Sequence, residues 1–210
     1  MQKKVKNNYL CNRKKKMLNN YNIFMWEIIL WALAGGATGG IIGLVELFSN
    51  KKTLITGPLS SGKTTFLKHI SKEKIPDGPS GAPRKYKVKN GMFDEVTDFS
   101  GAEAWLKSKF NDYIKEHDYI LFFFDISEYI KDIKYRADSN ARIDMIHRNS
   151  TSYQKVLIVG THVDKLRGNY QAEIENLFAG KPYQSVLNRV VYIDTTKKEC
   201  VETILNELKK

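Results

Sequence analysis

The stretch Thr53-Leu-Ile-Thr-Gly-Pro-Leu-Ser-Ser-Gly-Lys-Thr-Thr65 decides how the chain folds. Residues 52–56 predict a short strand, and residues 64–71 have the apolar spacing of a helix. The loop between them has the pattern Gly-x-x-x-x-Gly-Lys-Thr, which is typical of a loop that wraps a phosphate group. An ordinary turn rich in glycine and serine, with a surface lysine, is the competing interpretation, but the strand and the helix are expected where a phosphate loop needs them.

Each residue type in this loop suits phosphate chemistry. Gly57 and Gly62 let the backbone turn tightly, so that successive N–H groups converge on one phosphate. Lys63 brings a positive charge to the β- and γ-phosphate oxygens, and Thr64 offers its hydroxyl to Mg²⁺. The amino-terminal end of the following helix also attracts the phosphates. The predicted contacts from this loop are Gly57, Ser60, Ser61, Gly62, Lys63, Thr64 and Thr65.

Length and charge limit the possible architectures. The chain has 210 residues and a net charge of +11, which leaves room for one substantial core with a tail or an anchor. Residues 1–22 form a basic tail with seven basic side chains and no acidic one. Such a tail suits acidic lipid headgroups or nucleic acid, or is a solvated leader. Cys11 and Cys200 lack metal or redox spacing, which indicates a reducing compartment.

Residues 23–49 are predicted to form a hydrophobic membrane-anchor helix. Between Glu27 and Glu46 lie 18 residues without a charge, which as a helix span about 27 Å of a hydrocarbon core of about 30 Å. Glycine at every fourth position gives a stripe for close helix contact in lipid. We expect residues 23–48 to contact membrane lipid, as a single span or an in-plane anchor, with a helix packed on the domain as the alternative. A cleaved secretory signal is rejected because it would export a nucleotide-binding domain.

The rest of the chain alternates between strands and helices. Residues 85–97 alternate in polarity around Asn90-Gly91, which predicts a hairpin with a two-residue turn. Alternation then predicts an α/β fold in residues 50–210, with a mostly parallel sheet between two layers of helices and one antiparallel edge strand from the hairpin. Further strands are expected at 118–125, 154–160 and 189–193, and helices at 102–117, 127–150, 170–179 and 199–208.

A carboxylate and a glycine follow the hairpin. Asp98 comes about 35 residues after Lys63 and suits a carboxylate that holds Mg²⁺ through water. Gly101 can bring its N–H to a γ-phosphate. This spacing is a weak signal alone, because Asp and Gly are common at strand ends.

A second carboxylate indicates which base is bound. The stretch Thr161-His-Val-Asp164 follows a buried strand, and a carboxylate there accepts from two donors on a guanine edge and repels the acceptor on adenine. The stretch Asp194-Thr-Thr-Lys197 follows the last strand and can close its backbone over the base. GTP or GDP with Mg²⁺ is therefore the predicted ligand.

Over about residues 50–210 the sequence resembles the Ras-like small GTPase superfamily. The phosphate loop, Asp98-x-x-Gly101, Thr161-His-Val-Asp164 and Thr195-Thr-Lys197 occur in the family's order and spacing. His162 replaces the family's lysine, a variant similar to Roc-type GTPase domains. The hydrophobic segment before the domain is similar in layout to the signal recognition particle receptor beta subunit.

The resemblance implies a P-loop NTPase G domain, preceded by the N-terminal hydrophobic helix. Lys63, Thr64 and Gly101 are then expected to serve catalysis, and Thr64 and Asp98 to hold Mg²⁺. Contacts to the guanine nucleotide beyond the phosphate loop are expected from Gly101, Thr161, His162, Asp164, Thr195, Thr196 and Lys197.

The departures from the family predict slow hydrolysis. Ala102 stands where the family has the glutamine that orients the attacking water, and Ser80 is the nearest substitute for the first switch's threonine. Without these side chains, phosphoryl transfer loses much of its positioning. Glu103 or His117 could compensate, but each is more often an ordinary residue on a helix surface.

These patterns favour a membrane-anchored GTP-binding switch whose domain faces the cytoplasm. A protein partner is expected to read the loops near 75–84 and 98–104, and no nucleic-acid partner is expected. One alternative is a permanently GTP-loaded structural subunit, and another is an oligomerising membrane-remodelling GTPase. An ATP-using kinase would leave Asp164 without a role.

Overall fold

The computed structural model describes residues 51–76, 78, 82–88, 93, 95–99, 103–166, 168–187 and 190–210, without the side chains of 103–108. Backbone contacts group residues 50–210 into one compact unit. The predicted basic tail and anchor helix lie outside the described residues. Within the described part of the chain, no helix is long and apolar enough to cross a bilayer.

The unit is built on a six-stranded sheet with the order β2-β3-β1-β4-β5-β6. All neighbouring strands are parallel except β2 and β3, which are antiparallel. The prediction of a mostly parallel sheet with one antiparallel edge strand is therefore confirmed. The strands are β1 (Lys52–Thr56), β2 (Arg84–Lys87), β3 (Glu95–Asp98), β4 (Tyr119–Asp125), β5 (Lys155–Thr161) and β6 (Val190–Tyr192).

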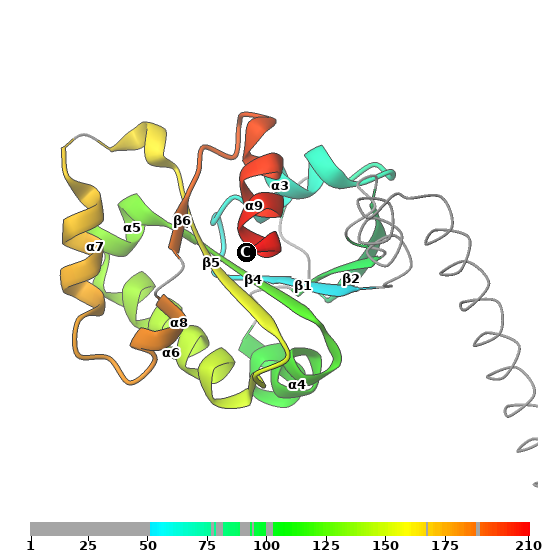
Figure 1. Ribbon diagram of the computed structural model, residues 1–210, viewed down its shortest axis with the longest axis horizontal. Coiled ribbons are helices and arrows are strands. Elements are labelled where there is room, and N and C mark those ends of the chain that lie inside the picture. The colour runs from blue at the N-terminus through cyan, green and yellow to red at the C-terminus, as the bar shows by residue number, and fades with distance from the viewer. Residues whose placement is uncertain are drawn as a thin grey trace, which may run out of the picture. The chain divides into compact units, whose positions relative to one another are not determined.

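Helices cover both faces of the sheet (Figure 1). On one face α3 and α9 bury their apolar sides against β1, β4 and β5, and on the other face α4, α6 and α7 do so. The central strand β4 is apolar from Ile120 to Phe124, because a parallel strand covered on both faces needs no polar side. The helices are α3 (Lys63–Ile70), α4 (Glu103–Glu116), α5 (Ile126–Lys131), α6 (Ile133–Asn149), α7 (Tyr170–Phe178), α8 (Gln184–Leu187) and α9 (Glu199–Lys209), with a 3₁₀ turn η1 (Val163–Lys165).

The hairpin forms with a different register from the one its sequence predicts. A two-residue turn at Asn90-Gly91 would pair Lys87 with Asp94, whereas β2 and β3 pair Lys87 with Glu95. The turn itself lies outside the described residues. The Lys72 N–H, just after α3, donates to the Lys87 carbonyl at 3.0 Å. A contact from a third segment therefore bears on the end of β2, and local turn rules do not include it.

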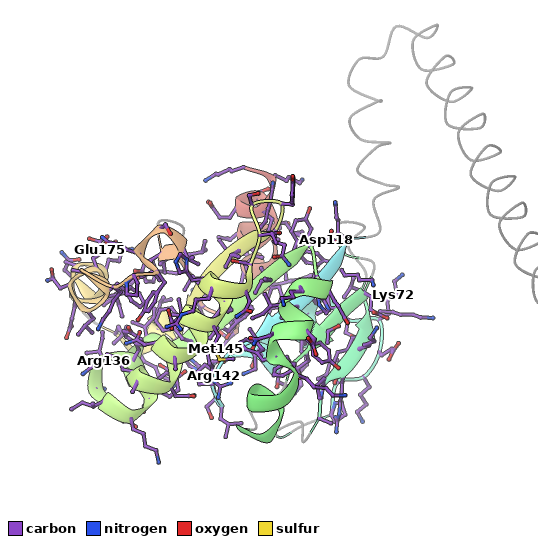
Figure 2. The ribbon with its side chains drawn as sticks, turned by 90° about the horizontal axis from the view of Figure 1, so that it is seen from below. Lys72, Asp118, Arg136, Arg142, Met145 and Glu175 are labelled. Carbon is purple, nitrogen blue, oxygen red and sulfur yellow. The ribbon has the colours of Figure 1, made fainter. Side chains whose placement is uncertain are left out.

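The two ends of the parallel strands carry different residues. The parallel strands all end at one edge, where open α/β sheets bind their ligands. Figure 2 shows Lys72, after α3, and Asp118, before β4, on the side of the unit opposite to Arg136 and Glu175. There the Lys52 N–H donates to the Asp118 carboxylate at 2.9 Å.

His117 lies just before β4, at the edge away from the phosphate loop, and its predicted place on a helix surface is wrong. Its side chain is only 6% exposed. In the neutral ring, Nδ1 donates to the Tyr113 carbonyl at 2.6 Å and Nε2 accepts from the Thr97 hydroxyl at 2.8 Å. Burial lowers the pKa of His117, which favours this neutral form. The ring is a buried structural group, and both of its nitrogens have partners within the domain.

Candidate functional site

The loop after β1 has the shape that its glycines predict. Gly57 has a φ of 143° and Gly62 a φ of 82°, and Ser60 between them has a φ of 59°. A Cβ on Gly57 would lie 2.0 Å from the Phe123 carbonyl oxygen of β4. Because backbone cannot move aside as a side chain can, this position requires glycine. The loop therefore turns tightly against β4 and leads directly into α3.

Lys63, the first residue of α3, folds its side chain back over the loop. Its Nζ donates to the Gly57 carbonyl at 2.9 Å, the Pro58 carbonyl at 2.6 Å and the Ser61 hydroxyl at 3.0 Å. Burial lowers the pKa of Lys63 to about 8, against an opposing effect of the Asp98 charge. The ammonium therefore lies inside the loop and donates to three neutral oxygens. The oxygens of a bound phosphate would replace them as acceptors.

Asp98 ends β3 close to the phosphate loop. In the sheet register it pairs with Ile55, two residues before Gly57, and its side chain is buried. Thr64, in the first turn of α3, is half-buried. Mg²⁺ at a nucleotide takes most of its ligands from water and phosphate and needs only one or two protein oxygens. In the described ranges, no group of three or more His, Cys, Asp or Glu could hold a metal without such help.

Gly101 and Ser80, the two residues predicted near the γ-phosphate, lie outside the described residues. Ala102, which follows Gly101, lies outside them as well. Their roles stay predictions.

The loop after β5 is tied to the phosphate loop through Thr161, which is fully buried. Its hydroxyl lies 3.1 Å from the Ser61 carbonyl and 3.0 Å from the Phe124 carbonyl. The next residue, His162, has a φ of 60° and starts the 3₁₀ turn that contains Asp164. Asp164 is exposed to solvent. The carboxylate predicted to read the base thus comes three residues after the contact with the phosphate loop, and it is accessible to a ligand.

The loop after β6 also packs on the phosphate loop. The buried Thr195 places its hydroxyl only 3.0 Å from where a Cβ on Gly62 would lie, and its carbonyl contacts His69 Nε2 at 2.9 Å. Thr196 donates its hydroxyl to Asp194 at 2.6 Å, and this contact lowers the pKa of Asp194. Lys197 Nζ lies 3.6 Å from the same carboxylate. Thr195 touches the phosphate loop, whereas Thr196 and Lys197 are exposed and fix the turn around Asp194.

Motif reasoning does not find two charged residues of this region, Asp125 and Lys165. Asp125, at the end of β4, contacts His162 Nδ1 at 3.1 Å and Lys165 Nζ at 3.3 Å. The sequence signal available for Asp125 is its place three residues before Glu128, which is the spacing of a helix capping box. That signal predicts the cap of α5 and gives no hint of the contact with the loop after β5.

Comparison with known proteins supports the same fold. No family model matches the sequence, and a search of curated proteins found no match. The solved structure of bacterial selenocysteine-specific elongation factor EF-Sec is similar, with 17% identity and a TM-score of 0.58 over 76% of this chain and 28% of that chain. A probable GTP-binding protein engB is similar with 15% identity and a TM-score of 0.55, over 75% of this chain and 96% of that chain.

The chain spans little more than a quarter of the elongation factor and nearly all of engB. At these identities the likeness shows the fold alone. Together with the strand order and the loop after β1, it shows that the described residues within 51–210 share the fold of these two proteins, which resembles a P-loop G domain.

Proposed function

We propose that this chain is a membrane-anchored GTP-binding protein that acts as a nucleotide-dependent switch and hydrolyses GTP slowly. One observation carries the nucleotide-binding part of the proposal. The Thr161 hydroxyl lies between the carbonyls of Ser61 and Phe124. This contact joins the loop that presents Asp164 to the loop that holds Lys63.

The chemistry at the two loops supports guanine over adenine. The Lys63 ammonium attracts the phosphates of any nucleotide and so gives no preference between bases. The Asp164 carboxylate accepts from the two donors on a guanine edge, and adenine presents an acceptor there. The similar engB structure is itself described as a probable GTP-binding protein.

The test replaces the base-reading carboxylate. In Asp164→Asn the amide can accept from one guanine donor only, and it donates where xanthine has a carbonyl oxygen. We expect GDP affinity to fall on the order of a hundredfold and XDP affinity to rise, measured by fluorescence titration of the full chain with Mg²⁺. Asp112→Asn, an exposed change on α4, is the control. Equal affinity of the unmodified protein for ADP and GDP would overturn the proposal.

Slow hydrolysis follows from the residue after Gly101, which is alanine. A side chain that orients the attacking water supplies much of the rate in such sites. We expect an unaided single-turnover rate below about 10⁻² s⁻¹, measured with radiolabelled GTP and excess protein. A rate well above that value would show that another group performs the positioning.

The membrane and partner parts of the proposal rest on the sequence of residues 23–48 and on the loops near 75–84 and 98–104.

The departures from the family pattern at Ala102 and Ser80 favour a second candidate, a permanently GTP-loaded subunit that recruits its complex without switching. Identification of the nucleotide released from the purified full chain separates the two. Retained GTP supports the loaded subunit, and GDP supports the switch. Flotation with liposomes tests the anchor.

A further inference from the structure

The residues on each side of Asp164 are held by one buried carboxylate. His162 Nδ1 and Lys165 Nζ both contact the same Asp125 oxygen, at 3.1 Å and 3.3 Å. Asp125 is 2% exposed, so this ion cluster is shielded from solvent on the Asp125 side. Asp164, between the two tethered residues, is exposed. The turn that presents the base-reading carboxylate is therefore fixed at both ends while its tip stays accessible.

Both carboxylate oxygens of Asp125 have partners. Its Oδ1 accepts from the backbone N–H groups of Ser127 and Glu128, which caps α5, and its Oδ2 takes His162 and Lys165. The two oxygens have separate tasks, one in a helix cap and one in the loop after β5.

The contacts continue to the phosphate loop. His162 Nδ1 also lies 2.9 Å from the Thr161 hydroxyl, which in turn reaches the Ser61 carbonyl at 3.1 Å. A chain of polar contacts thus runs from the end of β4 through the loop after β5 to the loop that holds Lys63. Because the Asp125 carboxylate is buried, removing its partners would leave an unpaired charge in the interior.

We infer that Asp125 is a positioning residue for Asp164, and that it sets selectivity for the guanine base without touching the nucleotide. The inference rests on the proposed guanine binding. A carboxylate that is already in place loses less freedom when the ligand binds, so its contribution to affinity is larger. Phosphate binding by Lys63 does not depend on the contacts of Asp125 with His162 and Lys165, since Lys63 is held by its own loop.

The test variant is Asp125→Asn, which keeps the Oδ1 helix cap because asparagine caps helices as well as aspartate does. It replaces Oδ2 with an amide that donates toward two other donors. We expect the affinity for GDP to fall about tenfold, with the affinity for ADP unchanged. The ratio of the two affinities, measured on the full chain with Mg²⁺, is a quantity that a general loss of packing would not shift.

Asp132→Asn is the matched control. Asp132 caps α6 through the same pair of contacts, to the N–H groups of Lys134 and Tyr135. This variant makes the same chemical change at a second helix cap and should leave the ratio of GDP to ADP affinity as it is. A shift as large as that of Asp125→Asn would overturn the inference.

A double-mutant cycle decides whether Asp125 acts through Asp164. In the Asp164→Asn background, Asp125→Asn should have no further effect on GDP affinity. Additive losses would overturn the inference. So would an unchanged affinity ratio in Asp125→Asn when the unmodified protein prefers GDP. If the unmodified protein shows no preference, the proposed function itself fails.

Lys165→Met provides a second route if Asp125→Asn does not fold. Half of the Lys165 side chain is exposed, so the change cannot disrupt the core, and it removes one of the two tethers. We expect a loss of guanine preference in the same direction but smaller. Full retention of the preference in both Lys165→Met and His162→Gln would contradict the tether.

Discussion

At the phosphate end of the candidate site the contacts of Lys63 join residues two to six positions apart in the chain. At the base end, the contacts that hold the loop after β5 to β4 and to the phosphate loop join residues 37 to 100 positions apart. The first set belongs to one continuous loop, and the second exists only when β4, β5 and the phosphate loop are assembled. In the proposed function, a local motif therefore binds the phosphates and a tertiary network positions the base-reading carboxylate. The two ends should therefore respond differently to substitution.

The largest effect is expected from Gly57→Ala at the phosphate end. The new Cβ would lie 2.0 Å from the Phe123 carbonyl oxygen at a φ of 143°, so the loop must move away from β4. We expect the free energy of unfolding to fall by at least about 3 kcal/mol, with loss of binding to every nucleotide. Urea denaturation and GDP titration measure the two effects.

Gly180→Ala is its control. Gly180 also has a positive φ, of 71°, but nothing lies within 4 Å of an added Cβ, so only the backbone strain of about 1 kcal/mol is expected. Equal losses for the two variants would show that the close approach to β4 has no special weight.

The next effect is expected from Thr161→Val at the base end. Valine keeps the shape of the side chain but leaves the carbonyls of Ser61 and Phe124 without the hydroxyl that now contacts them. We expect a loss of about 1–3 kcal/mol in the free energy of unfolding and a weaker preference for guanine. Thr161→Ser restores the hydroxyl and should recover the preference, which calorimetric titration with GDP and ADP would show. An unaffected preference in the valine variant would mean that the two ends are not joined here.

The pH dependence of binding sharpens the comparison, because it belongs to the phosphate end. In the free protein the Lys63 pKa is about 8, and a bound phosphate anion favours the charged form and raises that pKa. Binding therefore takes up a proton above about pH 8, and affinity falls as the pH rises, by at most about tenfold per pH unit. ADP and GDP should show the same slope up to about pH 9. A flat profile for both would contradict the role of Lys63.

The smallest effect lies away from both ends. Burial holds the pKa of His117 below its ordinary value of 6.5, so the unfolded chain takes up a proton first as the pH falls. Stability should decrease below about pH 6.5, by at most about 1.4 kcal/mol per pH unit. His117→Gln should flatten this part of the unfolding profile and leave GDP affinity unchanged. An altered GDP affinity in His117→Gln would mean that the region around His117, before β4, is coupled to the candidate site.

Several features were predictable from the sequence because neighbouring residues determine them. The phosphate loop, the strand before it and the helix after it depend on glycine, lysine and apolar spacing within a short segment. The apolar run of β4 predicts a buried central strand, and the structure confirms it. The alternation of strands and helices likewise predicts the mostly parallel sheet.

Other features depended on the assembled fold. The hairpin register differs by one residue from its turn signal, and the end of β2 is also contacted by the segment after α3. His117 is buried because α4 and β3 close over it, which no local pattern encodes.

The sequence by itself determined the shape of the loop that is predicted to bind phosphates, since the glycines of one short segment between a strand and a helix set that shape. Only the tertiary structure decided that Asp125 would hold His162 and Lys165, and that Thr161 and Thr195 would lie against the phosphate loop. These residues come from the ends of different strands. Parallel pairing brings those ends to one edge of the sheet, and which side chains meet there depends on register and packing across the whole domain.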